Sequence, residues 1–110
     1  MAGSDIYTGT LDVLILKALT GGPLHGYGVG LWLRRRSAEV FQVKEGVLYP
    51  ALHRLLAKGL VTARWGLTDT GRRARFYSIT RKGEEHLRHE AATLVAHSEA
   101  VLAVLENPAG

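Results

Sequence analysis

The 110-residue chain contains no cysteine, which excludes a disulfide framework and the common cysteine-rich zinc folds. It has no apolar run near the roughly 20 residues that a membrane-spanning helix needs, and its first ten residues lack the basic and then apolar layout of a signal peptide. A glycine-rich phosphate loop is also missing, and no paired carboxylates are expected in a plausible cleft. We therefore expect a cytoplasmic protein that binds no membrane and is not an enzyme.

Charge is unevenly distributed along the chain, although the net charge is only +4. Residues 34–82 contain twelve lysines and arginines and three acidic residues, a net charge of +9. The rest of the chain has two basic and seven acidic residues, a net charge of −5, so the two parts together give +4. A basic middle section is typical of a module that binds a polyanion. The apolar fraction of 46 % suffices for the core of one small domain.

The first predicted helix begins at Thr8 or Thr10, either of which can cap it, and ends at Gly21–Pro23. Its apolar stripe has helical spacing and comprises Leu11, Leu14, Ile15, Ala18 and Leu19. Val13 and Leu16 lie on a second face of this helix. A helix that is apolar on two sides needs two partners, and we expect a second subunit to be one of them.

The second predicted helix runs from about Gly26 to Arg36. Three glycines in its first half would each cost about 1 kcal/mol relative to alanine, so we expect another backbone, of protein or ligand, to approach them closely. Arginines 34–36 end the helix, where cations complement its dipole, and we favour this structural explanation of the run. Trp32 is assigned to the core, as is Trp65 further along the chain.

The third predicted helix lies in the segment EGVLYPALHRLLAKGLV, residues 45–61. Leu48, Leu52 and Leu55 form its apolar stripe, and Gly59 ends it. Because the N–H groups of a first turn have no partner within the helix, Pro50 predicts that the helix begins near residues 46–48. The opposite face has small residues near its ends and polar residues in its middle, namely Gly46, Tyr49, Pro50, His53, Arg54 and Ala57.

A β-hairpin follows the third helix. Residues 60–66 and 72–80 have the composition and alternation of strands, and the Asp-Thr-Gly turn between them gives the hairpin a basic tip. Val61, Ala63 and Trp65 share one face of the first strand, and Tyr77 and Ile79 are the predicted core residues of the second.

The last predicted helix runs from Arg81 to about Glu106 and has an apolar seam of heptad spacing. The seam comprises Leu87, Ala91, Leu94, Ser98, Val101 and Leu105, widened by Val95 and Leu102. One helix projecting from a small domain cannot bury such a seam alone, so we predict a homodimer formed through it. Residues 107–110 are expected to be a disordered tail.

The order of these elements predicts a mainly α fold with a small β-hairpin. It is a winged helix-turn-helix domain over residues 8–80, followed by a long C-terminal dimerisation helix over residues 81–106. In this architecture the third helix enters the major groove of double-stranded DNA. The predicted DNA contacts at and near this helix are Lys44, Tyr49, Pro50, His53 and Arg54. Two structural explanations stay open: His53 as an ordinary surface residue, which we favour for it alone, and Tyr49 as cover for the edge of the core.

The chain resembles the PadR family of transcriptional regulators. The resemblance is carried in order by GTLDVLILKAL, GPLHGYGV, EGVLYPALHRL, KGLV, GRRARFYSIT and TRKGEEHL, which span roughly residues 8–88. It implies a winged-helix domain, a C-terminal dimerisation helix, an inverted-repeat operator and, usually, repression. It also implies DNA-binding roles for Tyr49 and for Gly71, Arg72 and Arg73 at the wing, while Tyr27 either supports the core or touches a phosphate. Many family members have a small polar residue where this chain has valine at position 47.

The sequence identifies no effector, although the resemblance allows a small molecule. A pocket between the first helix and the dimerisation helices, lined by Tyr7, Val13 and Leu16, is one place for it. His86 and His89 lie within one helical turn, but exposed surface is the better explanation, and we expect no metal or cofactor. The alternative function is a winged helix that binds an acidic protein partner through its basic face.

Overall fold

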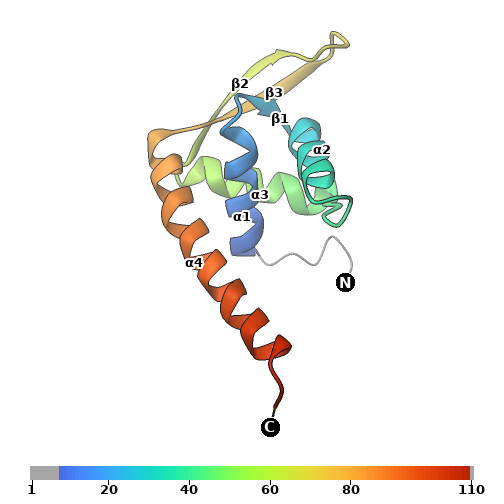
Figure 1. The fold of residues 1–110 in the computed structure, drawn as a ribbon. Coiled ribbons are helices and arrows are strands. Elements are labelled where there is room, and N and C mark those ends of the chain that lie inside the picture. The colour runs from blue at the N-terminus through green and yellow to red at the C-terminus, as the bar shows by residue number, and fades with distance from the viewer. Residues whose placement is uncertain (1–7, 110) are drawn as a thin grey trace.

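The computed structural model describes residues 8–109, which form four helices and one three-stranded antiparallel sheet (Figure 1). The elements are α1 (Thr8–Leu19), β1 (Leu24–His25), α2 (Gly26–Arg36), α3 (Glu45–Ala57), β2 (Val61–Leu67), β3 (Arg73–Ile79) and α4 (Arg81–Glu106). This is the predicted order of three helices, a hairpin and a long last helix. The short strand β1 was absent from the prediction because two residues carry no periodic pattern.

Helix α1 is the centre of the hydrophobic core. Leu11, Ile15 and Leu19 of its predicted stripe are at most 2 % exposed, and they pack with residues of α2, α3 and the sheet. Leu16 on the second face is 0 % exposed as well, and Val13 is 7 % exposed. The prediction that Leu16 contacts a second subunit is therefore wrong, because α2, α3, α4 and the sheet already surround α1. Val13 likewise has little exposed surface with which to contact a second subunit.

The sheet has the strand order β1-β3-β2, so β3 is its central strand. Tyr77 of β3 pairs with Leu24 of β1 on one side and with Ala63 of β2 on the other. It is 3 % exposed, which confirms its prediction as a core residue. The far half of the hairpin extends past the helices (Figure 1). Trp65 lies in that half and is 59 % exposed, so its assignment to the core is wrong.

Helix α3 begins one residue earlier than predicted, at Glu45, with Lys44 as its N-cap. Pro50 is thus the sixth residue of the helix and lies inside it, so the carbonyl of Gly46 has no N–H at position 50 to accept. The predicted end of the helix is confirmed, because Gly59 adopts a φ of +73°, a conformation that favours glycine. Leu48, Ala51, Leu52 and Leu55 are buried, as predicted for the inner face.

Helix α4 is fastened to the domain at its first turn. The hydroxyl of Thr80 accepts a hydrogen bond from the N–H of Gly83 at 3.0 Å and donates one to the carbonyl of Gly59 at 2.8 Å. The ammonium of Lys82 donates to the carbonyl of Lys58 at 2.9 Å. Gly83 itself is buried against Leu60, so the start of α4 is held on the junction between α3 and β2.

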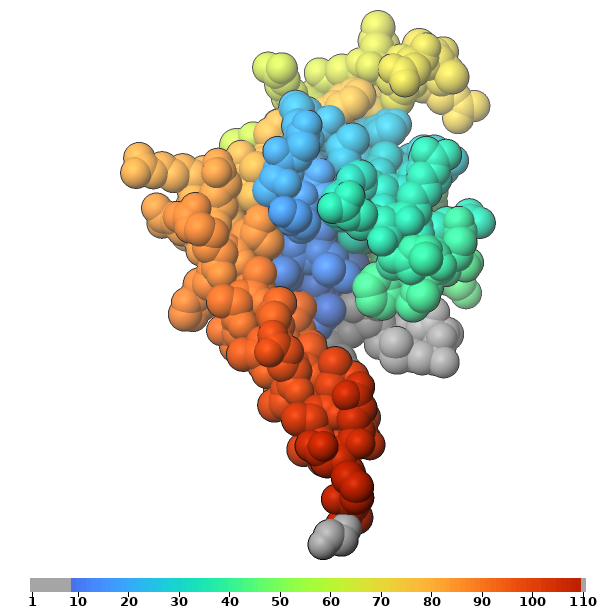
Figure 2. Space-filling model, viewed as in Figure 1, coloured from blue at the N-terminus to red at the C-terminus, as the bar shows by residue number. Residues whose placement is uncertain are grey.

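Beyond this attachment α4 runs past α1 and extends from the body as an arm (Figures 1 and 2). The molecule accordingly measures 59 × 28 × 21 Å along its principal axes. The predicted seam is half-buried at its start and exposed along the rest of the arm: Leu87, Ala91 and Leu94 are half-buried, and Val95, Ser98, Val101, Leu102 and Leu105 are exposed. Within residues 8–109, no helix is long and apolar enough to cross a membrane.

Gly83→Ala should destabilise the protein, because a Cβ at this position would lie 2.1 Å from the carbonyl oxygen of Leu60 and 2.8 Å from Cγ1 of Ile79. The obstacle is backbone, so the start of α4 must shift, and we expect a loss of about 1–3 kcal/mol in the free energy of unfolding, measured by urea denaturation. Gly9→Ala is the matched control, since nothing lies within 4 Å of its Cβ. It should instead raise stability by up to about 1 kcal/mol. Equal urea midpoints for the two variants would contradict this account of the α4 attachment.

Candidate nucleic-acid interface

The outer face of α3 carries exposed side chains opposite the buried leucines. Tyr49, Pro50 and His53 are all exposed, and Lys44 is exposed at the N-cap just before the helix. The two faces of α3 therefore divide as the sequence predicted. A face of this kind, with an aromatic hydroxyl, an imidazole and a nearby ammonium, presents donors and acceptors that can reach base edges and phosphates.

Tyr49 lies directly on the first residue of α2. A Cβ built on Gly26 would meet Cε1 of the Tyr49 ring at 2.6 Å, and its Cζ and hydroxyl at 3.0 Å. Gly26 is buried, while Tyr49 is 39 % exposed. Tyr49 thus both covers the edge of the core and presents polar surface, so its two alternative explanations are compatible.

The glycines of α2 accommodate side chains rather than another backbone, which corrects the prediction. Besides Tyr49 over Gly26, the ring of His25 lies against Gly28, with Nδ1 at 2.9 Å from a built Cβ. His25 is the N-cap of α2, because its Nδ1 accepts a hydrogen bond from the N–H of Gly28 at 3.3 Å. Its ring also stacks on Phe76 of β3 at 5.3 Å, which ties α2 to the hairpin. This cap was missed because histidine is not a typical capping residue.

The surroundings of Tyr49 favour the protonated form of its hydroxyl. Burial of the ring raises the pKa of Tyr49 above its ordinary value, and the nearby Glu45 and Tyr77 raise it further. Near neutral pH the hydroxyl is therefore uncharged and available both to donate and to accept a hydrogen bond.

Arg54 links α3 to α1 through an ion pair. Its Nη2 donates to Oδ1 of Asp12 on α1 at 2.9 Å, and the Asp12 side chain is 9 % exposed. The guanidinium neutralises a nearly buried carboxylate and holds α3 against α1. Because 36 % of the Arg54 side chain is exposed, its predicted DNA contact stays a prediction. The sequence alone does not identify Arg54 as the ion-pair partner of Asp12.

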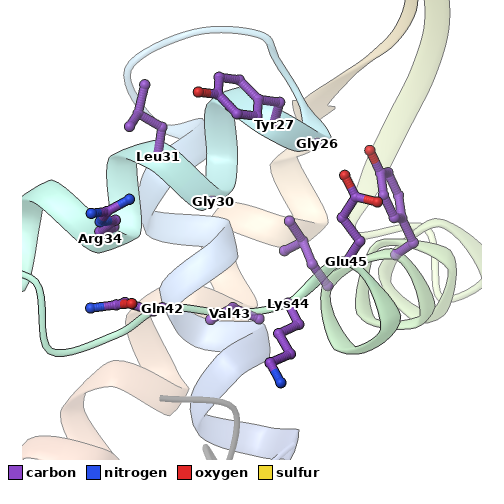
Figure 3. Close-up of a pocket in the computed structure, with 11 residues that line it drawn as sticks. Gly26, Tyr27, Gly30, Leu31, Arg34, Gln42, Val43, Lys44 and Glu45 are labelled. Carbon is purple, nitrogen blue, oxygen red and sulfur yellow. The ribbon is translucent and has the colours of Figure 1, made fainter. Parts of the chain in front are cut away.

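A cleft of about 540 Å³ separates α2 from the start of α3 (Figure 3). Tyr27, Leu31 and Arg34 come from α2, and Lys44 and Glu45 point in opposite directions from the start of α3 (Figure 3). Tyr27 is 69 % exposed, so it contributes little to the core, and its phosphate contact stays a prediction. Of the residues expected to line an effector pocket beside α1, Leu16 is fully buried and Tyr7 lies outside the described residues.

The tip of the hairpin is a tight turn that displays arginines. Gly71 has a φ of +81°, and its N–H donates to the carbonyl of Thr68 at 2.9 Å. The N–H of Arg72 donates to the Thr68 hydroxyl at 3.1 Å, and the side chains of Arg72 and Arg73 are exposed. Over residues 8–109, no arginine of the hairpin forms an ion pair with an acidic side chain.

Metal ligands are not assembled in the part of the chain that the structure describes. No group of three or more histidine, cysteine, aspartate or glutamate side chains there is placed to hold a metal ion. The described parts of α3, α2 and the hairpin instead present hydrogen-bond donors and cations, which are the groups that bind a polyanion.

The chain is similar to known transcriptional regulators. Residues 15–89 match the sequence model of the transcriptional regulator PadR-like family. Transcriptional regulator Rv3488 of Mycobacterium tuberculosis is 35 % identical over 82 residues, which are 74 % of this chain and 76 % of that protein. Negative transcriptional regulator PadR of Bacillus subtilis is 27 % identical over 77 residues, 70 % of this chain and 42 % of that protein.

The fold is also similar to that of a solved transcriptional regulator. The crystal structure of a PadR-like transcriptional regulator from Bacillus cereus superimposes with a TM-score of 0.77 and 26 % sequence identity, covering 91 % of this chain and 95 % of that chain. Together with the order of the elements, this likeness confirms the predicted winged helix-turn-helix fold class.

Gly26→Ala should displace the Tyr49 ring without unfolding the domain, because the obstacle is the far end of a side chain. Once the ring leaves its half-buried position, the pKa of Tyr49 should fall back toward its ordinary value of about 10. NMR titration of the tyrosine ring carbons measures this. Gly30→Ala is the control one turn along α2, since its Cβ would lie 3.6 Å from Leu48, an ordinary contact. An unchanged Tyr49 pKa in Gly26→Ala would show that the glycine does not position the ring.

Proposed function

The chain belongs to the PadR-like family of transcriptional regulators, and we propose that it binds an inverted-repeat DNA operator as a homodimer and represses transcription. The observation that carries this proposal is the exposed face of α3, where Tyr49 and His53 lie opposite a fully buried leucine face. In a winged helix-turn-helix protein this face enters the major groove. Such a regulator acts in the cytoplasm and, as expected, is not an enzyme.

Three surfaces support DNA as the ligand. The α3 face supplies the groups that can distinguish base edges. The start of α2, where Tyr27 is exposed beside the cleft, would contact a phosphate. The wing supplies Arg72 and Arg73, whose charge attracts any sequence alike and adds affinity that weakens with salt. Lys44 extends the positive surface to the N-cap of α3.

The exposed seam of α4 supports a homodimer. Leu102 is 51 % exposed and Leu105 is 75 % exposed, on an arm that no other part of residues 8–109 covers. A second α4 of heptad spacing buries these side chains in a self-complementary contact. Two recognition helices joined in this way can enter successive major grooves, about 34 Å apart. We accordingly assign residues 8–80 to DNA binding and 81–106 to dimerisation.

Repression is proposed because the Bacillus subtilis relative is named a negative transcriptional regulator. A small-molecule effector would relieve it by changing the angle between the two domains across the α4 pair, because half-site spacing tolerates little error. The alternative function is recognition of an acidic protein by the same basic surface. Binding that depends on DNA sequence separates the two, because an acidic partner does not read bases.

Tyr49→Ala and Arg72→Ala should weaken DNA binding in different ways. Tyr49→Ala should reduce the preference for a selected operator duplex over a scrambled one by roughly tenfold, the loss expected when a base contact disappears. Arg72→Ala should weaken binding to both duplexes alike and lower the slope of log affinity against log salt by about 1.8, because each of the two protomers loses one phosphate contact worth about 0.9. Fluorescence anisotropy with labelled duplexes measures both effects. A preference that survives Tyr49→Ala intact would remove Tyr49 from sequence readout.

Leu102→Glu should convert the dimer to a monomer in analytical ultracentrifugation, because it places a charge in the middle of the α4 contact. The fold of each protomer should be unaffected, since Leu102 touches solvent in the single chain. Val104→Glu is the matched control: its side chain is 77 % exposed and lies off the heptad seam, so that variant should remain a dimer. A Leu102→Glu protein that still sediments as a dimer would refute the α4 interface.

A further inference from the structure

A groove lies on the side of α2 that faces away from α3. It has a volume of about 440 Å³, and its walls come from β1 and α2 alone: Leu24, Gly28, Leu31, Trp32, Arg35 and Arg36. We name these six residues the α2 groove. The helix dipole accounts for arginines at the end of α2, but it does not account for the apolar residues beside them.

The glycines of α2 show on which side of the helix the groove lies. A Cβ on Gly26 or Gly30 would meet side chains of α3, whereas a Cβ on Gly28 would meet side chains of β1. Trp32 and Arg35 follow Gly28 by four and seven residues, so the three share one face of the helix. The width of α2 therefore separates the groove from the α3 face that we propose to bind DNA.

The apolar part of the groove centres on Trp32. Trp32 and Leu24 are half-buried, and both pack against the hydrophobic core. The predicted core position of Trp32 is thus only partly realised, because the rest of its side chain lines the groove. Tryptophan and arginine are the residues in which the binding energy of protein interfaces is most often concentrated.

The cationic part of the groove consists of two arginines without acidic partners. Arg34 is paired with Glu39, whereas within residues 8–109 neither Arg35 nor Arg36 forms an ion pair. Both are exposed. The guanidinium carbon of Arg36 lies over the Trp32 ring, 5.6 Å from its centroid, so the groove presents an indole and a cation together.

The shape and charge of the groove select its occupant. A small molecule needs a site that encloses about 70–90 % of its surface, but this groove has walls on one helix and one short strand only. A second copy of the same surface would be repelled, because residues 26–36 contain three arginines and no acidic residue. Nucleic acid is disfavoured because its regularly spaced phosphates need cations spread along a surface, whereas these cations lie at one end of an apolar stretch.

We propose that the α2 groove docks an acidic, apolar segment of another protein. Leucine or phenylalanine side chains of that segment pack on Trp32 and Leu24. Its carboxylates pair with Arg35 and Arg36, whose planar guanidinium groups bind carboxylates through two parallel hydrogen bonds. The groove is separate from the α3 face, so one protomer can hold this partner and DNA at the same time. This inference does not depend on the proposed DNA-binding function.

The test begins with a phage library of random peptides, selected for binding to the full-length protein. We expect enrichment of peptides that carry aspartate or glutamate next to leucine or phenylalanine. A synthetic copy of the most enriched peptide is then titrated into the Trp65→Phe protein, in which Trp32 is the sole indole because the chain has two tryptophans. Its fluorescence should shift to shorter wavelength as the peptide covers the groove.

Three variants locate the peptide. Arg35→Glu should weaken peptide binding at least about tenfold, because it sets a like charge against the carboxylates. Arg36→Lys keeps the charge but lacks the planar fork, so it should also weaken binding. Arg88→Glu is the matched control: Arg88 is exposed on α4 and the change in net charge is the same, so this protein should bind the peptide as the parent does. Urea unfolding checks that all three variants are folded.

Other occupants of the groove give different results. Failure to enrich any peptide, or enrichment of neutral peptides that bind the Arg35→Glu protein as tightly as the parent, would overturn the inference. Displacement of the peptide by a DNA duplex, together with duplex binding that is weaker for Arg35→Glu than for Arg88→Glu, would assign the groove to DNA. Self-association of a Leu102→Glu protein that Arg35→Glu abolishes would assign it to a second copy of the chain.

Discussion

The burial of both apolar faces of α1 is the constraint on which the rest of the structure depends. Because both apolar faces of α1 are covered within one chain, α2, α3, α4 and the sheet are fixed around one core. The ion pair between Asp12 and Arg54 also links α1 to α3, so the position of the proposed recognition helix depends on the same core. The surfaces left for the proposed DNA binding and dimerisation are the outside of α3, the wing and the arm of α4.

These surfaces differ in what they contribute. The α3 face presents few groups, and the contact between Gly26 and Tyr49 holds one of them in a defined place. The wing presents charge, and the stack of Arg73 on Trp65 limits how that charge moves. The arm of α4 presents exposed apolar side chains. In the proposed function, selectivity, affinity and assembly are thus divided among separate elements of one small protein.

Patterns within one element were predictable from the sequence. The two faces of α3 and the bounds of α4 followed from apolar spacing, and Gly59 was identified as a helix end. What could not be predicted depends on where elements lie relative to one another. Leu16 is buried and Trp65 is exposed because of how far the helical body reaches, which a local pattern does not encode. The partner of Arg54 is 42 residues away in the chain, and no spacing rule connects them.

The most direct test of the account is selection of duplexes from a random-sequence DNA library by the full-length protein. It needs no assumption about which gene is regulated. The account predicts enrichment of an inverted repeat whose two half-sites are centred about one helical turn, roughly 10 base pairs, apart. Recovery of duplexes with no sequence in common, although the protein retains them at low salt, would contradict it. The protein would then bind DNA through its basic surface alone, and α3 would not recognise a DNA sequence.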